Sequence, residues 1–135
     1  MTQQSDSLTA AILQFVDEVN RGDAPAALAH FTDDVVIVMD LPPYRLEGAG
    51  AGLQWLQMMG GNAAKLGTTA VALHPAAPRR VEADETTGYC ILPGKLTMDG
   101  PAAHLTAEGE LTMAARFVGG GWKFCAMTWA GGAPA

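Results

Sequence analysis

Apolar residues near the N-terminus recur every three or four positions, which is the spacing of one face of an α-helix. They predict an amphipathic helix over about residues 7–20 and are Leu8, Ala11, Ile12, Phe15, Val16 and Val19. Gly22 can end this helix because glycine readily adopts the left-handed conformation. Asp23 then caps a second, short helix with Pro25 in its first turn, which we expect to end near Thr32.

The middle of the chain predicts a strand, a loop and a third helix. The β-branched run over residues 35–39 is typical of a strand, and the prolines at 42–43 end it because proline cannot donate to a sheet. A loop follows over residues 41–47. Apolar residues then return at helical spacing, and we expect the glycines at 60–61 to end that helix; the apolar residues are Leu53, Trp55, Leu56, Met58 and Met59.

Beyond Lys65 the pattern is that of strands separated by turns rich in glycine and proline. We predict strands over residues 66–74, 79–83, 86–92, 96–98, 105–118 and 122–130, with turns at 75–78, 93–94, 99–100 and 119–121. Helices followed by antiparallel strands favour an α+β fold over alternating βαβ units. We therefore expect a single domain over residues 1–135, with an ordered core of about 6–130.

Composition narrows the classes of function. Hydrophobic residues make up 49% of the 135 residues and charged residues 16%, which allows a true core. The net charge is −6 and no basic run exceeds the Arg79–Arg80 pair, so we exclude a nucleic-acid partner. No apolar run approaches the roughly 20 residues that span a bilayer, so we exclude the membrane. The polar start of the chain lacks a signal sequence, which predicts a cytoplasmic protein.

Candidate metal ligands and nucleophiles are few in this sequence. His30, His74 and His104 fall on three separate elements without the spacing of a metal site, so we expect neither a metal nor a cofactor. His30 ends the second predicted helix, where a structural role beside the helix dipole is sufficient. Cys90 and Cys125 lie in separate strand-like runs, which predicts two buried thiols.

Two stretches of the chain resemble a known superfamily. The first runs from Asn-Arg-Gly-Asp at 20–23 through Thr-Asp-Asp at 32–34 to Glu-Gly at 47–48, and the second is the hairpin over residues 115–124 with its three central glycines. With the order of elements, they make nearly the whole chain similar to the nuclear-transport-factor-2-like superfamily, which includes ketosteroid isomerases and SnoaL-like polyketide cyclases. The resemblance implies N-terminal helices packed on a strongly curved, mostly antiparallel sheet that forms a cone with an internal apolar pocket.

The resemblance also implies where catalytic groups would lie. Ketosteroid isomerases use a tyrosine, an aspartate base and a protonated aspartic acid, and these positions fall here on Phe15, Met39 and Met113. Phenylalanine and methionine cannot move a proton, so we expect no typical ketosteroid isomerase. Asp40 is the remaining candidate base, which points inward only if the strand ends in a bulge. The alternative for Asp40 is a rim aspartate that caps the turn at 42–43.

The pocket implied by the resemblance has a soft, methionine-rich lining, which suits a flexible or planar apolar ligand. Regular alternation places Cys125, Met127 and Trp129 on one face of the last strand. Tyr44 lies in the loop that roofs the pocket, and Tyr89 either lines it or packs on the outer face. The other lining residues are Phe15, Ile37, Met39, Trp55, Leu111 and Met113. The alternative is that these side chains fill the core.

Three functions are compatible with this lining. The first is a SnoaL-like protein that binds an apolar or aromatic metabolite. The second is an isomerase, cyclase or hydrolase of the ketosteroid-isomerase-like type that uses Asp40 as its base. The third is a non-catalytic domain that forms a homodimer through the outer sheet face, as members of the resembled superfamily commonly do. Phe117, Phe124 and Ala126 are candidates for that outer face.

Overall fold

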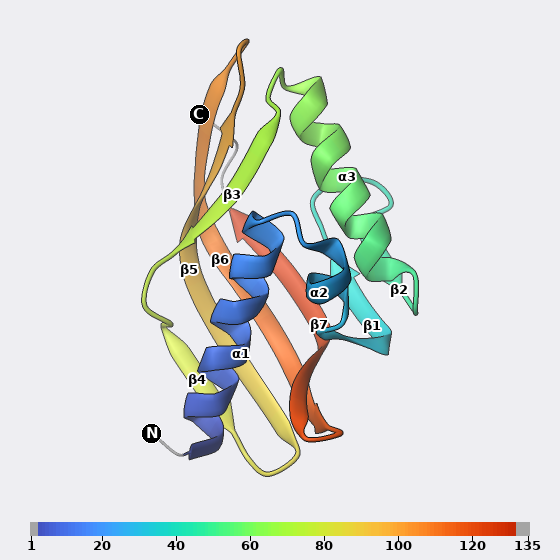
Figure 1. Ribbon diagram of the computed structural model, residues 1–135, viewed down its shortest axis with the longest axis vertical. Coiled ribbons are helices and arrows are strands. Elements are labelled where there is room, and N and C mark those ends of the chain that lie inside the picture. The colour runs from blue at the N-terminus through green and yellow to red at the C-terminus, as the bar shows by residue number, and fades with distance from the viewer. Residues whose placement is uncertain (1–2, 132–135) are drawn as a thin grey trace.

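The helices come first in the chain and the long strands afterwards, as Figure 1 shows. The computed structural model describes residues 3–131. Its helices are α1 (Gln3–Asn20), α2 (Ala24–Leu28) and α3 (Ala51–Lys65). Its strands are β1 (Phe31–Val38), β2 (Arg45–Glu47), β3 (Ala70–Pro75), β4 (Arg80–Ala83), β5 (Thr87–Asp99), β6 (His104–Val118) and β7 (Gly121–Gly131). Within the described residues, the structure has no helix that is long and apolar enough to cross a membrane.

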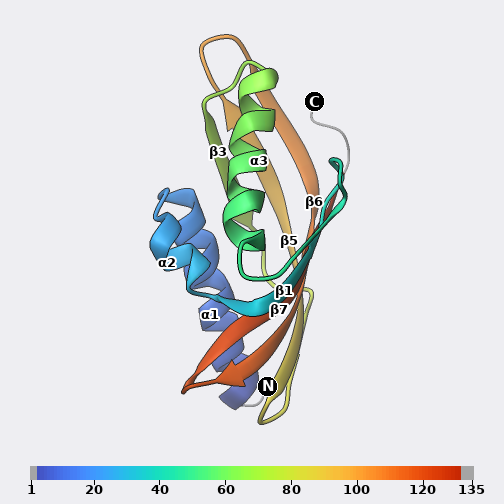
Figure 2. The same cartoon turned by 90° about the vertical axis from the view of Figure 1, so that its right-hand side faces the viewer.

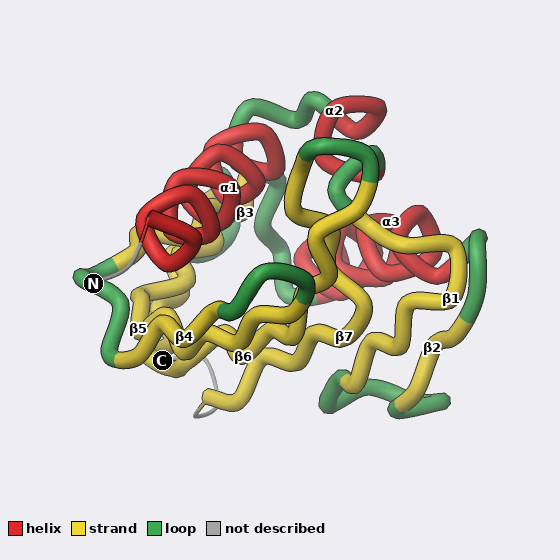
Figure 3. The backbone as a smooth tube through the Cα atoms, turned by 90° about the horizontal axis from the view of Figure 1, so that it is seen from below, coloured by secondary structure: helices red, strands yellow, loops and turns green. Residues whose placement is uncertain are grey.

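The strands form one curved sheet in the order β2-β1-β7-β6-β5-β3, and β4 also pairs with β5. All pairs are antiparallel except that of β1 with β7, which is parallel. The helices lie on the concave face, so the molecule has two layers (Figures 2 and 3). The α+β fold expected from the sequence is confirmed: helices on a strongly curved, mostly antiparallel sheet that does not close.

Helix α1 is held against the sheet by its apolar face and by one hydrogen bond near each end. Near its start, the Trp122 indole Nε1–H donates to Ser7 Oγ at 2.8 Å. At its end, the Asn20 amide pairs with the backbone of edge strand β3, accepting from Leu73 N–H at 2.9 Å and donating to Leu73 C=O at 2.8 Å. Because an amide side chain can do both, Asn20 satisfies a stretch of sheet edge as another strand would. The core lies between these two anchors.

Strand β5 runs through Pro93-Gly94, where the sequence predicted a turn. Its edge partner changes there, from β4, which pairs Arg80 with Ile91, to β3, which pairs Pro75 with Gly94. The Pro93 carbonyl accepts from Ala76 N–H at 2.9 Å, in the connection between β3 and β4. A backbone N–H at Pro93 would point to this same side, toward the connection between β3 and β4. The pairing of β5 with β6 on the other side therefore loses no hydrogen bond. The two strands predicted over 86–98 are therefore one.

Two helix ends differ from the sequence prediction. Helix α2 ends at Leu28 instead of near Thr32, because Phe124 N–H donates to His30 C=O at 2.6 Å and β1 starts pairing with β7 at Phe31. Helix α3 continues through the glycines at 60–61 to Lys65, and Gly67, with a φ of 80°, follows its end. Leu53, expected among the helical apolar residues, is exposed.

A β-bulge in β7 sets which residues of the last strand enter the core. Phe124 pairs with Ala115 and Ala126 pairs with Ala114, which leaves Cys125 as the extra residue. The bulge resets the alternation, so both Phe124 and Met127 are buried. The expectation that Phe124 lies on the outer face is therefore wrong. Phe117 is 42% exposed and packs edge-on against Trp122 near the hairpin tip, with ring centroids 5.2 Å apart.

Two glycines in α3 allow a matched test of how closely this helix packs on its neighbours. A Cβ on Gly60 would meet no atom within 4 Å, so Gly60→Ala should raise the free energy of unfolding by about 0.5–1 kcal/mol, because alanine favours helices. A Cβ on Gly52 would lie 2.7 Å from the Phe31 ring and 2.8 Å from Leu28. We expect Gly52→Ala to lower the free energy of unfolding by about 1–2 kcal/mol, because the Phe31 ring and the Leu28 side chain would both have to shift. Urea unfolding curves measure both changes; equal midpoints for the two variants would contradict this packing.

Candidate functional site

Eight of the eleven residues predicted to line a pocket belong to the core or pack against it, and they form two groups by exposure. Five of them are buried in the core between the helices and the sheet: Phe15, Ile37, Leu111, Met113 and Met127. Met39, Trp55 and Trp129 are only partly buried, and they pack against that core. The first group therefore packs between the helices and the sheet, and the second marks where apolar side chains reach the surface.

The Phe15 ring occupies the centre of the core. It meets the rings of Phe31 and Phe124 edge-on at 5.3 Å and stacks on Trp55 at 6.2 Å. Phe15 thus stands with aromatic partners where the resembled isomerases carry a tyrosine. Met113, where the resemblance places their protonated acid, is also buried. These two positions contribute packing to the core.

Five of the partly buried apolar side chains that pack against the core come from α3, from β3 and β7, and from the end of β1, and we call them the Trp55 cluster. They are Met39, Trp55, Met58, Leu73 and Trp129. Figure 2 shows α3 standing over the concave face of the sheet, and the helix contacts β1, β2 and β3. Trp129 has room because its neighbour Gly109 lacks a side chain: a Cβ there would lie 2.7 Å from the indole Cζ2. The cluster offers aromatic and thioether surface to a ligand.

Three polar residues singled out from the sequence, Asp40, Tyr44 and Tyr89, are exposed to solvent. Asp40 is exposed in the loop after β1, which closes on itself where Met39 N–H donates to Tyr44 C=O at 2.9 Å. Tyr44 is 58% exposed. Tyr89 is 37% exposed beside the buried Cys90, and the Arg80 guanidinium lies 5.6 Å from the centre of its ring. Because side chains alternate along β5, Tyr89 faces away from the core.

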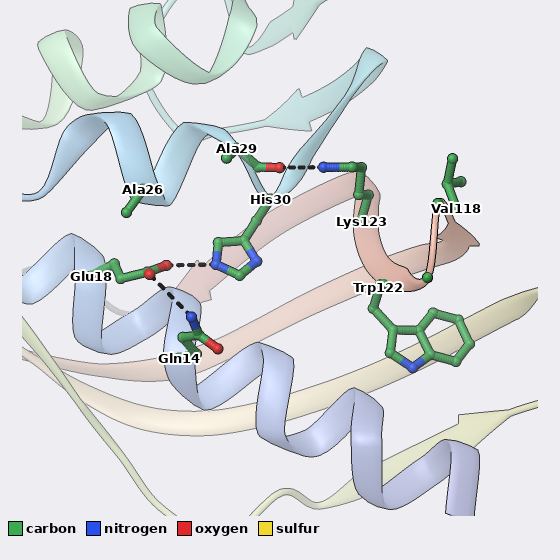
Figure 4. A pocket seen from close by; sticks show the side chains of 11 residues that line it. Gln14, Glu18, Ala26, Ala29, His30, Val118, Trp122 and Lys123 are labelled. Carbon is green, nitrogen blue, oxygen red and sulfur yellow. Dashed lines mark hydrogen bonds and ion pairs between the residues drawn. The ribbon is translucent and has the colours of Figure 1, made fainter.

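A second region, which the sequence did not suggest, lies under the β6–β7 hairpin. Figure 4 shows Glu18 of α1 facing His30, which lies between α2 and β1, with 2.5 Å between Glu18 Oε1 and His30 Nε2. The second carboxylate oxygen accepts from Gln14 Nε2 at 3.3 Å. The two paired side chains are only 8% and 15% exposed, for Glu18 and His30 respectively. Buried carboxylates are rare unless paired, so this contact is a specific feature of the fold.

The Glu18–His30 pair borders an open recess of about 440 Å³. Its walls come from α1, α2 and the hairpin, and they are formed by Gln14, Glu18, Ala26, Ala29, His30 and residues 118–123. Lys123 Nζ lies on this wall and donates to Ala29 C=O at 2.7 Å. The recess therefore holds an acidic, an imidazole and an ammonium group together.

One signal in the sequence could have indicated Glu18. It follows Phe15 by three residues and so continues the apolar stripe of the first helix, where an unpaired charge is unfavourable. Its partner could not be identified in the same way, because the turn at 22–23 and the early end of α2 bring His30 back onto α1. The structural role expected for His30 stays a prediction, and the structure adds Glu18 as the partner of its ring.

The described residues contain no group of three or more histidine, cysteine or acidic side chains placed to hold a metal ion. Cys90 is buried, whereas Cys125, in the bulge, is half-buried. Burial raises the pKa of the Cys90 thiol to about 11, although a backbone hydrogen bond from Met113 acts in the opposite direction. Cys90 is therefore an inert part of the core.

Solved structures share this fold at low sequence identity. A scytalone dehydratase-like protein from Novosphingobium aromaticivorans has a TM-score of 0.80 and 13% identity, over 96% of this chain and 85% of its own. A ketosteroid isomerase-like protein from Erwinia carotovora has 0.77 and 18%, over 99% and 100%. A nuclear-transport-factor-2-like protein of unknown function from Pseudomonas putida has 0.74 and 17%, over 93% and 84%. No family model and no curated protein matches the chain.

The two cysteines should differ in reactivity. Iodoacetamide reacts with the thiolate, and a pKa of about 11 keeps Cys90 protonated at pH 8. We expect the folded protein to be alkylated at Cys125 first and at Cys90 only after denaturation in urea, as peptide mass spectrometry would show. A Cys125→Ser variant serves as the control and should stay unlabelled while folded. Equal labelling of both cysteines in the folded protein would contradict the burial of Cys90.

Proposed function

We propose, from the nuclear-transport-factor-2-like fold of this chain and the composition of the Trp55 cluster, that the protein binds an apolar or aromatic small molecule beside α3. The observation that supports this proposal most directly is that Met39, Trp55 and Trp129 pack on the core yet stay partly exposed. Large apolar side chains that gather at a surface are typical of ligand sites.

The energetics of burial favour such a ligand. Covering about 100 Å² of apolar surface contributes roughly 2.5 kcal/mol, so micromolar affinity, about 8 kcal/mol, requires a ligand that covers more than about 300 Å² of apolar surface. Methionine side chains adapt to ligand shape, which favours a class of related compounds over one compound.

Binding is better supported than catalysis at this site. Phe15, Met39 and Met113 stand where the resembled isomerases carry their acid and base groups, and they have no proton to exchange. Asp40, the candidate base, is exposed to solvent. An exposed carboxylate is neither held against a substrate nor shielded from water, so it lacks the positioning that general-base catalysis needs. We therefore assign the Trp55 cluster a binding role.

A tryptophan series tests this function. A thermal-shift screen with 1-anilinonaphthalene-8-sulfonate and a panel of planar apolar compounds should find compounds that raise the melting temperature. The best of them should quench tryptophan fluorescence, and Trp55→Phe with Trp129→Phe should remove most of that quenching and weaken binding about tenfold. Each indole loses surface area and a specific contact to the ligand, which accounts for the loss.

Trp122 supplies the matched control, because it is buried and its indole donates a hydrogen bond to Ser7 near the start of α1. Trp122→Phe should leave the affinity unchanged even though it removes one indole. Equal loss of affinity in the Trp122 variant and in the Trp55 and Trp129 variants would reject the proposed site. A screen in which no compound stabilises the protein would reject the binding function itself.

A further inference from the structure

The Glu18–His30 pair has the geometry of a base held in one orientation. The carboxylate can only accept hydrogen bonds, so the nitrogen that faces it, Nε2, carries the proton. In the neutral ring, Nδ1 then has the free lone pair. Figure 4 shows the ring with Nε2 toward Glu18 and the other nitrogen turned to the hairpin side of the recess. A carboxylate that orients an imidazole and stabilises its protonated form is the arrangement of many catalytic histidines.

The neighbours of His30 fix the ring in this position. Its ring stacks on Phe124, with centroids 5.9 Å apart and planes at 21°, and meets Phe15 edge-on at 5.8 Å. Gln14 occupies the second oxygen of Glu18, so the carboxylate cannot turn away without losing that contact. These contacts hold the pair in the arrangement of Figure 4, with the accepting nitrogen presented to the recess.

The recess beside His30 has room for a small molecule and a cation to neutralise it. The hairpin contributes Gly119 and Gly120, where a Cβ would meet no atom within 4 Å, so the wall there is open. Lys123 brings an ammonium group whose position is fixed by the Ala29 carbonyl. Val118, Trp122 and Ala26 supply apolar surface. A base, a cation and an apolar wall are the groups needed to remove a proton next to a developing negative charge.

We propose that Glu18 and His30 form a proton-transfer site for a small carbonyl compound with an acidic α-proton, separate from the Trp55 cluster. Nδ1 of His30 takes the proton from carbon, the electron pair of the broken C–H bond forms the C=C bond, and the carbonyl oxygen becomes an enolate. Lys123 neutralises the enolate oxygen, and Glu18 stabilises the imidazolium. Return of the proton to carbon restores the base, so the step needs no co-reactant. Phe15 and Phe124 separate this site from Trp55.

A generic proton-transfer probe tests the site without knowledge of the natural substrate. In 5-nitrobenzisoxazole, a base removes the proton on carbon and the N–O bond breaks, which releases a coloured phenolate. We expect the protein at pH 8 to convert this probe faster than free imidazole at the same concentration. His30→Gln should lower the rate about tenfold or more, and Glu18→Gln should lower it by a smaller factor. His74→Gln, a histidine exposed on β3, is the control and should keep the full rate.

A measurement on the unmodified chain avoids any loss of folding in the variants. Long-range nitrogen-15 spectra of histidine rings should show His30 with an unprotonated Nδ1 and a protonated Nε2. Addition of the phenolate product should shift the His30 ring signals and leave those of His74 and His104 in place. A His30→Gln variant as fast as wild type, a protein no faster than imidazole, a proton on Nδ1, or an unshifted His30 ring would each overturn the proposal. None of these outcomes bears on the binding of apolar compounds at Trp55.

Discussion

The packing of the Phe15 ring is the contact on which the rest of this structure depends. One side chain from α1 touches rings from β1, α3 and β7, and so connects the helical layer to the sheet at its centre. Loss of a buried phenylalanine typically destabilises a protein by about 3–5 kcal/mol, a large share of the 5–15 kcal/mol that stabilises a domain. Both candidate sites contact this ring, because Trp55 stacks on one side of it and His30 meets it edge-on.

The bulge at Cys125 brings the Phe124 ring into contact with Phe15. Regular alternation back from Met127 would turn Phe124 outward, and the extra residue turns it into the core, onto Phe15 and His30. The two aromatic residues then divide the interior: apolar side chains reach the surface on the α3 side, and an acid–imidazole pair faces the recess under the hairpin. One small domain can thereby offer an apolar and a polar site a few side chains apart.

The sequence predicted what depends on local chemistry. The first helix, the Asp23 cap, the glycine hairpin and the order of helices before strands all follow from spacing and turn residues, and the structure has them. It failed where distant segments decide. Pro93 lies inside a strand because the edge partner changes beside it, the bulge depends on pairing with β6, and His30 meets Glu18 only because α2 ends early to let β1 join β7. The apolar character of the lining was readable, but which of its members reach the surface was not.

We infer that Phe15 and Phe124 separate two sites of opposite character. Titrating isotope-labelled protein with the most stabilising apolar compound tests it, with the indole N–H signals of the three tryptophans and the ring signals of His30 followed in the same spectra. The division predicts that Trp55 and Trp129 shift in a saturable way while Trp122 and His30 stay in place. Shifts centred on His30 and the hairpin glycines, with Trp55 and Trp129 unmoved, would contradict it.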